Sequence, residues 1–146
     1  MSDRGQLRVK RLATVAILPT RSHADDAGLD LHASEDLVIG AGECRTIATG
    51  IAIALPPGTE GQVRPRSGLA QEYCVTVLNS PGTIDEGYRG EIRVILINHG
   101  RRPFHVKSGM RIAQLVVQPR LSIDLLEVES LTDTARGPGG FGSTGK

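Results

Sequence analysis

A short, turn-rich segment of the sequence contains a carboxylate suited to general base catalysis. The segment reads NSPGTIDEGYRGEI, residues 79–92, and holds Asp85, with Tyr88 three positions later, between two apolar stretches. A carboxylate held rigidly beside a bound substrate can take a proton from a reacting group. An Asp between strands commonly braces a turn through its own backbone instead. The sequence leaves both roles open.

The segment VRPRSGLA, residues 63–70, contains three residues suited to phosphate oxygens. The guanidinium of Arg66, the hydroxyl of Ser67 and the free backbone amides around Gly68 meet at a predicted strand-to-helix junction. Such a junction can bind phosphate through charge-assisted hydrogen bonds and amide donors. The alternative is an ordinary helix start, with a serine cap and an arginine on the surface.

Two apolar stretches each contain one polar side chain that needs a partner. In DDAGLDL, residues 25–31, Asp30 lies between two leucines, so in a strand it faces away from them, toward water or a metal. In GMRIAQLVV, residues 109–117, Gln114 interrupts an apolar strand. A buried amide needs a hydrogen-bond partner, which here is either backbone or a ligand.

The C-terminal tail matches two phosphate-binding patterns without the structure that either one requires. GFGSTGK, residues 140–146, reads as a P-loop, and GPGGFG, residues 137–142, spells a dinucleotide-binding fingerprint. Both motifs work between a strand and a helix, and the given sequence has no room for that helix. We therefore interpret the tail either as a solvated end or as a Gly-rich arm whose Arg, Phe, Ser and Thr side chains contact an anion and a base.

Composition excludes several functional classes. The 146 residues predict one domain, and a formal charge of +1 provides no broad field for nucleic acid or an anionic membrane. Cys44 and Cys74 form neither a disulfide framework nor a zinc motif, so we expect both to be reduced and buried. No run is long enough to span a membrane. The run RVKRLATVAIL, residues 8–18, mimics a secretory signal but suits a strand better, alternating at first and then buried.

The pattern of apolar runs and turns predicts an all-β fold. Short runs rich in Val, Ile, Leu and Thr alternate with turns that contain Gly or Pro. The expected strands are LDLHA, DLVI, RTIATGIAIAL, YCVTVLN, EIRVILIN, RIAQLVVQP and IDLLEV, and one short helix is expected at SGLAQEY, residues 67–73. We predict a β-sandwich or jelly-roll-like barrel, whose four aromatic residues make a thin core that favours oligomerisation.

Five of these segments, in their order along the chain, resemble the five motifs of the trimeric deoxyuridine triphosphate nucleotidohydrolases, the dUTPases. The matching stretches are DAGLDL, PRSGLA, NSPGTIDEGYRGEI, GMRIAQLVV and RGPGGFGSTG. The resemblance implies a jelly-roll-like β barrel over residues 1–130, a mobile C-terminal arm over residues 131–146, and a homotrimer. It also implies cytoplasmic hydrolysis of Mg²⁺-bound dUTP to dUMP and pyrophosphate, which limits uracil in DNA and supplies dUMP for thymidylate synthesis.

The resemblance also assigns roles to individual residues. It makes Asp85 the base that orients and deprotonates the attacking water, and it places Tyr88 against the deoxyribose, where a 2′-hydroxyl would not fit. Asp30 helps to hold Mg²⁺ through water, and Asn79 reads the uracil together with the hairpin backbone around it. The other substrate-binding residues implied for the barrel are Arg66, Ser67, Gly68, Thr83 and Gln114.

In the family that the chain resembles, the arm closes over the nucleotide. Phe141 is thereby expected to stack on the uracil, Arg136, Ser143 and Thr144 to reach the terminal phosphate, and Gly142 to contact the substrate. Closure excludes bulk water and completes the positive charge around the phosphates. Each site of the family draws on all three subunits. The implied partners are therefore dUTP and two further copies of the chain, with no nucleic acid and no membrane.

Two other functions are compatible with the same scaffold. The dCTP deaminases share the fold and much of the motif order, but their pattern has a catalytic glutamate where this chain has Ile95 and tends to have a serine where it has Gly68. Zinc-dependent deaminases are excluded, because the sequence has no H-x-E or P-C-x-x-C. A non-catalytic nucleotide-binding protein is disfavoured by the presence of Asp85 and of the arm. We expect Glu86 to face away from the base site.

Overall fold

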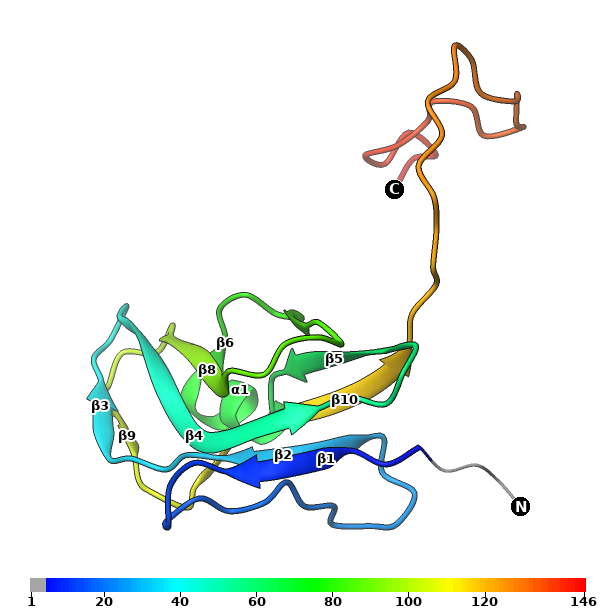
Figure 1. Cartoon of the computed structure of the whole chain (residues 1–146). Coiled ribbons are helices and arrows are strands. Elements are labelled where there is room, and N and C mark those ends of the chain that lie inside the picture. Colours follow the sequence, from blue (N-terminus) through cyan, green and yellow to red (C-terminus); the bar gives the residue numbers. More distant parts are fainter. Residues whose placement is uncertain (1–4) are drawn as a thin grey trace.

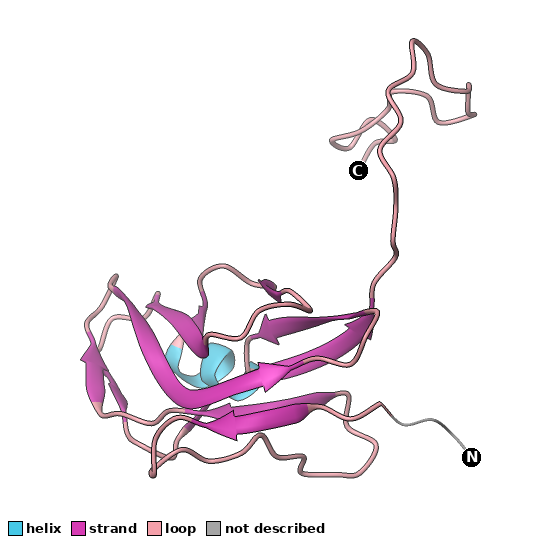
Figure 2. Ribbon diagram, in the orientation of Figure 1, coloured by secondary structure: helices cyan, strands magenta, loops and turns pink. Residues whose placement is uncertain are grey.

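The computed structural model describes residues 5–146, which form ten strands and one short helix (Figure 1 and Figure 2). One antiparallel sheet has the order β1 (Arg8–Arg11), β4 (Cys44–Ala54), β8 (Glu91–Asn98), β6 (Val75–Val77). A second has the order β2 (Gly28–His32), β10 (Arg111–Pro119), β5 (Thr59–Arg64), β7 (Gly82–Ile84). A third pairs β3 (Leu37–Ile39) with β9 (Phe104–Val106). The prediction of an all-β fold is confirmed.

The core of the domain is almost entirely aliphatic. Alternation along β8 buries Ile92, Val94 and Leu96, and β10 contributes Ile112 and Leu115. Of the four aromatic residues in the chain, only Phe104 is buried. The stabilisation of the domain therefore comes from many contacts between Val, Ile and Leu side chains, as the composition predicted.

The helix α1 (Ser67–Tyr73) occupies the predicted residues, but its first turn differs from the prediction. Arg66 is the N-cap residue and makes no side-chain capping hydrogen bond, so a cap by Ser67 is wrong. Because Arg66 is still extended (φ −94°, ψ 128°), Ser67 is the first helical residue and its side chain is exposed rather than folded back onto the helix. Within the described residues, no helix has the length and apolarity needed to cross a membrane.

The apolar run at residues 12–18 is not the buried strand that its composition suggested. β1 ends at Arg11, and Leu12 and Val15 are about half exposed (48% and 56%). The register with β4 ends at the pair Arg11–Ile51, next to Gly50, whose left-handed conformation (φ 69°) lies at an irregularity within β4. The run therefore leaves the sheet and crosses the surface.

The two cysteines are exposed, which contradicts the expectation that both are buried. Cys44 is the first residue of β4, whose first three residues are all exposed. Cys74 takes the left-handed conformation that ends α1 (φ 57°). Both positions lie at the ends of elements, where a side chain can stay outside the core.

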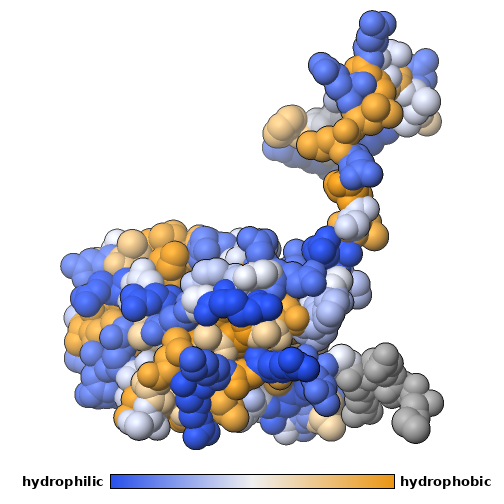
Figure 3. Space-filling view, in the orientation of Figure 1, coloured by the Kyte–Doolittle hydropathy of each residue, from blue (hydrophilic) through white to orange (hydrophobic). Residues whose placement is uncertain are grey.

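Beyond β10 the chain leaves the body of the molecule. Residues 120–146 form neither helix nor strand and extend away from the sheets in Figure 1. The run at residues 123–128, expected to be a strand, has no strand partner in the described part of the chain. The segment is nevertheless apolar along much of its surface (Figure 3), with exposed side chains at Leu121, Ile123, Leu125, Leu126, Val128 and Leu131. Such a surface is typically covered by another chain.

Asn98 joins the end of β8 to the small sheet and to the loop that follows. Its buried side chain donates from Nδ2 to the carbonyl oxygens of Ile39 (3.0 Å) and Arg102 (2.8 Å), and its Oδ1 accepts from the amide of Gly100 (2.8 Å). Asn98→Ala leaves these groups unpaired, so we expect urea denaturation to show a loss of about 3 kcal/mol in the free energy of unfolding. Gln71→Ala, on the exposed face of α1, is the control. Equal stability of the two variants would contradict this role.

Candidate active site

The residues predicted around Asp85 line one pocket. Asn79, Thr83, Asp85 and Tyr88 surround a cavity of about 220 Å³ beside β7, β8 and the turn that joins these strands. Ile84 of β7 is buried, whereas its two neighbours, Thr83 and Asp85, are exposed, as the alternation of a strand predicts. The rest of the lining combines Gly82, the charged Glu91 and Arg93, and four apolar side chains, Val63, Ile84, Ile92 and Ile95.

A tight turn presents Asp85 and Tyr88 to this pocket. The Tyr88 amide donates to the carbonyl oxygen of Asp85 (3.0 Å), and the Tyr88 hydroxyl donates to the carbonyl oxygen of Glu91 (2.9 Å). The Tyr88 ring lies over Gly90, where any Cβ would overlap it. Gly90 therefore positions Tyr88. Its spacing in the sequence did not reveal this role, because the contact exists only once the turn has folded.

A second pocket, of about 300 Å³, holds the residues predicted to bind phosphate. Its lining includes Asp30, Arg66, Ser67, Gly68 and Gln114. The residues come from three elements, β2, β10 and the start of α1. The antiparallel register of β2 and β10 places Gln114 directly opposite Asp30. The fold brings these five residues to one pocket, although they are up to 84 positions apart (114 − 30).

Asp30 lies between two guanidinium groups in this second pocket. Arg66 Nε is 3.3 Å from Asp30 Oδ1, and Arg111 Nη1 is 3.5 Å from Oδ2. The Asp30 side chain is only 16% exposed, so these charges are less screened than a surface pair. The sequence had not singled out Arg111. The contact between Arg111 and Asp30 follows from the register of β10 with β2, which the sequence alone does not give.

Gln114 is held by the backbone. Its Nε2 donates to the carbonyl oxygen of Pro65 (2.9 Å), the residue before Arg66. Its Oε1 lies over Gly28, where a Cβ could not be accommodated. Of the two partners considered for this amide, backbone and ligand, the structure shows the backbone. The amide thereby ties β10 to the segment that carries Arg66, the arginine predicted to bind phosphate.

The second pocket has carboxylates suited to a hydrated Mg²⁺ but no protein cage for the ion. Within residues 5–146, no three His, Cys, Asp or Glu side chains gather into a metal site. Mg²⁺ commonly keeps several waters and uses one or two carboxylates together with substrate phosphates. Asp30 and Asp26 both line the pocket and supply such carboxylates. The residues therefore fit an ion that arrives with a phosphorylated substrate.

The predicted residues of the C-terminal arm line neither pocket. Arg136 Nε donates to the carbonyl oxygen of Gly139 (2.9 Å), which closes a local turn. The turns that follow contain Phe141, Gly142, Ser143 and Thr144. The two pockets share no lining residue, and no residue after Gln114 lines either of them. The residues proposed from the sequence therefore form three separate groups within one chain.

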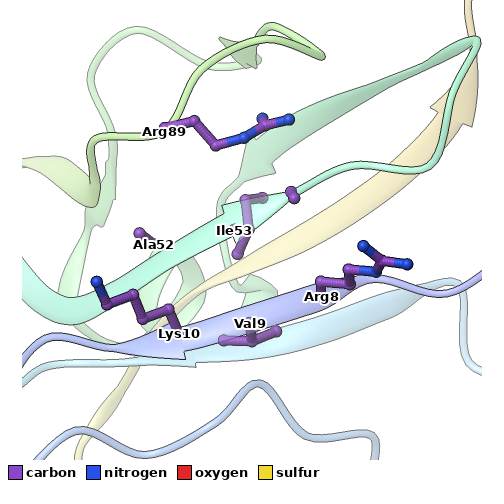
Figure 4. A pocket seen from close by; sticks show the side chains of 7 residues that line it. Arg8, Val9, Lys10, Ala52, Ile53 and Arg89 are labelled. Atoms are coloured by element: carbon purple, nitrogen blue, oxygen red, sulfur yellow. The ribbon is translucent and has the colours of Figure 1, made fainter.

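A groove that contains no predicted site residue lies along β1, the edge strand of its sheet. Figure 4 shows Arg8 and Lys10 on one side of β4 and Arg89 on the other, with the apolar Ile53 and Ala52 between them. The residues of the described chain that line this groove include no carboxylate. We call it the basic groove; it combines positive charge with an apolar floor.

Two pockets lie on this antiparallel β domain, one with the turn carboxylate Asp85 and one with guanidinium and hydroxyl groups that suit the phosphates of a nucleotide. The sequence profile of the dUTPases matches residues 14–145. The deoxyuridine 5'-triphosphate nucleotidohydrolase of Gloeothece citriformis is 60% identical over 140 residues, 96% of this chain and 97% of its own length. That of Clostridium acetobutylicum is 58% identical over 139 residues, 95% and 96% of the two chains. The chain belongs to the dUTPase family.

Solved structures agree with this family. The Staphylococcus bacteriophage 80alpha dUTPase with dUPNHPP superposes with a TM-score of 0.91 at 29% identity, over 97% of this chain and 99% of that chain. A dUTPase from phage phi11 of S. aureus, whose structure describes the coordination of a structural Mg(II) ion, superposes with a TM-score of 0.81 at 26% identity, over 88% and 99%. The fold and the family predicted from the sequence are thus confirmed.

His32 lies two residues after Asp30 and makes the second pocket's surroundings sensitive to pH. Its side chain is buried, and its Nδ1 has no hydrogen-bond partner among the described residues. Burial lowers the pKa of His32 below its ordinary 6.5; the Asp30 carboxylate raises it, and Arg111 and Arg66 lower it. Because folding favours the neutral imidazole, its stabilisation is complete above the unfolded pKa and is lost as the pH falls below it.

We expect His32→Gln to reduce the pH dependence of stability. Between about pH 7 and pH 5 the wild type should lose more free energy of unfolding than this variant, because glutamine has no proton to bind. Urea denaturation at each pH measures the difference. His99→Gln, which removes an exposed histidine, should follow the wild type. Equal slopes for His32→Gln and the wild type would contradict the buried, neutral state of His32.

Proposed function

We propose that this chain hydrolyses dUTP to dUMP and pyrophosphate. Membership of the dUTPase family supports the reaction. The observation that supports the roles of individual residues is the pocket shared by Asp85, Asn79 and Tyr88. A carboxylate, an amide and a phenol ring in one small cavity suit a general base, a group that reads a nucleobase edge and a ring that packs on a sugar.

Asp85 orients a water molecule and takes one of its protons. The water oxygen attacks the α phosphorus, the bond from this phosphorus to the oxygen that bridges to the β phosphorus breaks, and pyrophosphate leaves with that electron pair. Positioning contributes as much as basicity, because the turn holds Asp85 in place before the substrate arrives. Mg²⁺, when bound, neutralises part of the charge on the phosphates.

Asn79 and the neighbouring backbone read the uracil. A donor and acceptor pattern that matches uracil leaves buried polar atoms unpaired against cytosine. The Tyr88 ring, held over Gly90, leaves no room for a 2′-hydroxyl. Ile95 lines the same pocket at the position where a dCTP deaminase would need its glutamate, which favours hydrolysis over deamination.

The triphosphate lies against the second pocket. Arg66 supplies charge and paired donors, Ser67 a hydroxyl, and Gly68 a backbone amide that no side chain shields. Gln114 holds the backbone before Arg66 through its hydrogen bond to Pro65, and so positions the Arg66 guanidinium in the pocket. Asp30 holds the hydrated Mg²⁺ through water. Thr83, in the first pocket, completes the contacts of the barrel with the substrate.

The site is completed by assembly into a homotrimer with shared active sites. Within one chain the two pockets share no lining residue and the arm lines neither, which supports an assembly in which the Asp85 pocket and the arm of one site come from different chains. Residues 121–131 support this assembly: they combine exposed apolar side chains with Asp124, Glu127 and Glu129, and so complement the basic groove of a neighbouring chain. Because dUTP is an intracellular nucleotide, we propose a cytoplasmic location.

The arm is residues 131–146, a mobile segment outside the barrel of residues 1–130. Phe141 stacks on the uracil, and Arg136, Gly142, Ser143 and Thr144 cover the phosphates. The exposed ring of Phe141 and its left-handed backbone (φ 50°), between two glycines, support a segment that presents this ring to a partner surface. Closure of the arm excludes water from the reacting centre.

Asp85→Asn should abolish turnover while leaving the fold intact. Purified wild type with Mg²⁺ is expected to convert dUTP, but not dCTP, dTTP or UTP, into the monophosphate and pyrophosphate. The variant should be slower by at least about a hundredfold, because the amide cannot accept the proton. Chelation of Mg²⁺ should lower the wild-type rate. Release of ammonia from dCTP would show a deaminase instead.

Gly90→Ala should weaken discrimination between deoxyribose and ribose. The added Cβ displaces the Tyr88 ring, so we expect kcat/KM for dUTP to fall about tenfold and the ratio of dUTP to UTP activity to narrow. Gly87→Ala, in the same turn, is the control, because a Cβ there meets no atom within 4 Å. An unchanged ratio in Gly90→Ala would remove Gly90 from the positioning of Tyr88.

Two truncations should separate the functions of the C-terminal segment. Removal of residues 136–146 is expected to lower turnover severely and leave the trimer intact. Removal of residues 121–146 should also abolish the trimer, because it takes away the exposed apolar segment proposed to lie on a neighbouring chain. Sedimentation and dUTP hydrolysis measure the two effects. Near-normal activity of the shorter truncation would exclude the arm from the site.

A further inference from the structure

We propose that Glu86 is a positioning residue that links the Asp85 turn to the start of the C-terminal segment. The inference rests on the proposed catalytic role of Asp85. Glu86 Oε2 accepts hydrogen bonds from the amide of Gly58 (3.2 Å) and from Nη2 of Arg120 (3.0 Å). The amide of Arg120 in turn donates to the carbonyl oxygen of Gly58 (3.0 Å). Three distant segments therefore meet at one carboxylate.

Glu86 differs from the rest of the turn in its surroundings. It is partly buried, whereas the other residues from Asp85 to Gly90 are exposed. It does not line the Asp85 pocket, which confirms the expectation that it faces away from the base site. In the described part of the chain, its hydrogen bonds are the only side-chain bonds that join residues 85–90 to a segment distant in sequence. Glu86 thus holds the turn on the side away from the Asp85 pocket.

Arg120 fixes the other end of the link. It follows Pro119, the last residue of β10, and is the first residue of the segment that leaves the body. Besides Glu86, its guanidinium binds Ser122, with Nη1 donating to the hydroxyl (3.2 Å). The direction in which residues 121–146 leave the sheet is therefore tied to the same carboxylate that holds the turn next to Asp85.

The ion pair is suited to setting geometry rather than stability. The side chains of Arg120 and Glu86 are 44% and 32% exposed, and pairs of this kind contribute little to stability. The hydrogen bond from Arg120 lowers the pKa of Glu86, followed by that from the Gly58 amide. Glu86 is therefore ionised at neutral pH, and the link is lost only as the pH falls into the acidic range. A substitution at Glu86 or Arg120 is therefore expected to move both Asp85 and the start of the C-terminal segment.

A double-mutant cycle tests the link in the full-length protein. We expect Glu86→Ala to lower kcat for dUTP about fivefold with little change in KM, Arg120→Gln to do the same, and the double variant to be no slower than the slower single variant. Glu86→Gln, which keeps a hydrogen-bond acceptor, should lie between Glu86→Ala and the wild type. Glu72→Ala, an exposed glutamate of α1, should match the wild type.

Hydrogen exchange supplies a readout that does not depend on activity. Glu86→Ala should speed exchange in residues 119–125, and Arg120→Gln should speed it in residues 85–91, because each variant releases the segment at the other end of the link. Additive effects on kcat, or exchange that changes only next to each substitution, would overturn the proposal. A wild type that does not hydrolyse dUTP would instead overturn the proposed function, and the exchange measurements would still decide whether the link exists.

Discussion

The position of β10 between β2 and β5 is the constraint on which the side of the protein proposed to bind phosphate depends. On one edge Gln114 pairs with Asp30, and on the other it pairs with Arg64, two residues before Arg66. Ala113 and Leu115, two residues apart on one face of β10, are fully buried and lock this register, because a slip by one residue would bring the polar Gln114 onto that face. Burial of aliphatic side chains thereby brings a carboxylate, an amide and an arginine together.

The Asp85 side of the protein is built differently. Asn79, Thr83, Asp85 and Tyr88 come from one continuous segment between β6 and β8, so their proximity follows from local turns, and Gly90 and Glu86 show how the turn is held in one shape. A short turn can be rigid when its side chains have fixed partners. Here the Tyr88 ring packs over Gly90, and the Glu86 carboxylate binds Gly58 and Arg120. The two pockets thus reflect two ways of placing functional groups: pairing between distant strands and bonding within a turn.

The sequence predicted the long strands and the helix well, because their periods and turn residues are local signals. The strands β5, β7 and β9 were missed, because TEGQVR has few apolar residues and GTI and FHV are too short to show a period, whereas the equally short β3 and β6 lie in apolar runs. The exposure of Cys44 and of residues 12–18 was predicted wrongly, because both depend on where a sheet ends. The grouping of site residues came from the resemblance in motif order. Arg111, Gly28, Gly90 and His32 were missed because their contacts are made only in the folded chain.

Sharing of each site between chains is tested most directly by mixing two inactive variants. Asp85→Asn keeps the arm, and the chain that lacks residues 136–146 keeps Asp85. If the Asp85 pocket and the arm of one site come from different subunits, equal amounts refolded together should regain about a quarter of the wild-type dUTP hydrolysis. In a randomly assembled trimer, about half of the sites receive an intact Asp85, and about half of those also receive an intact arm. No recovery in mixed trimers would contradict shared sites and would place Asp85 and the arm of each site in one chain.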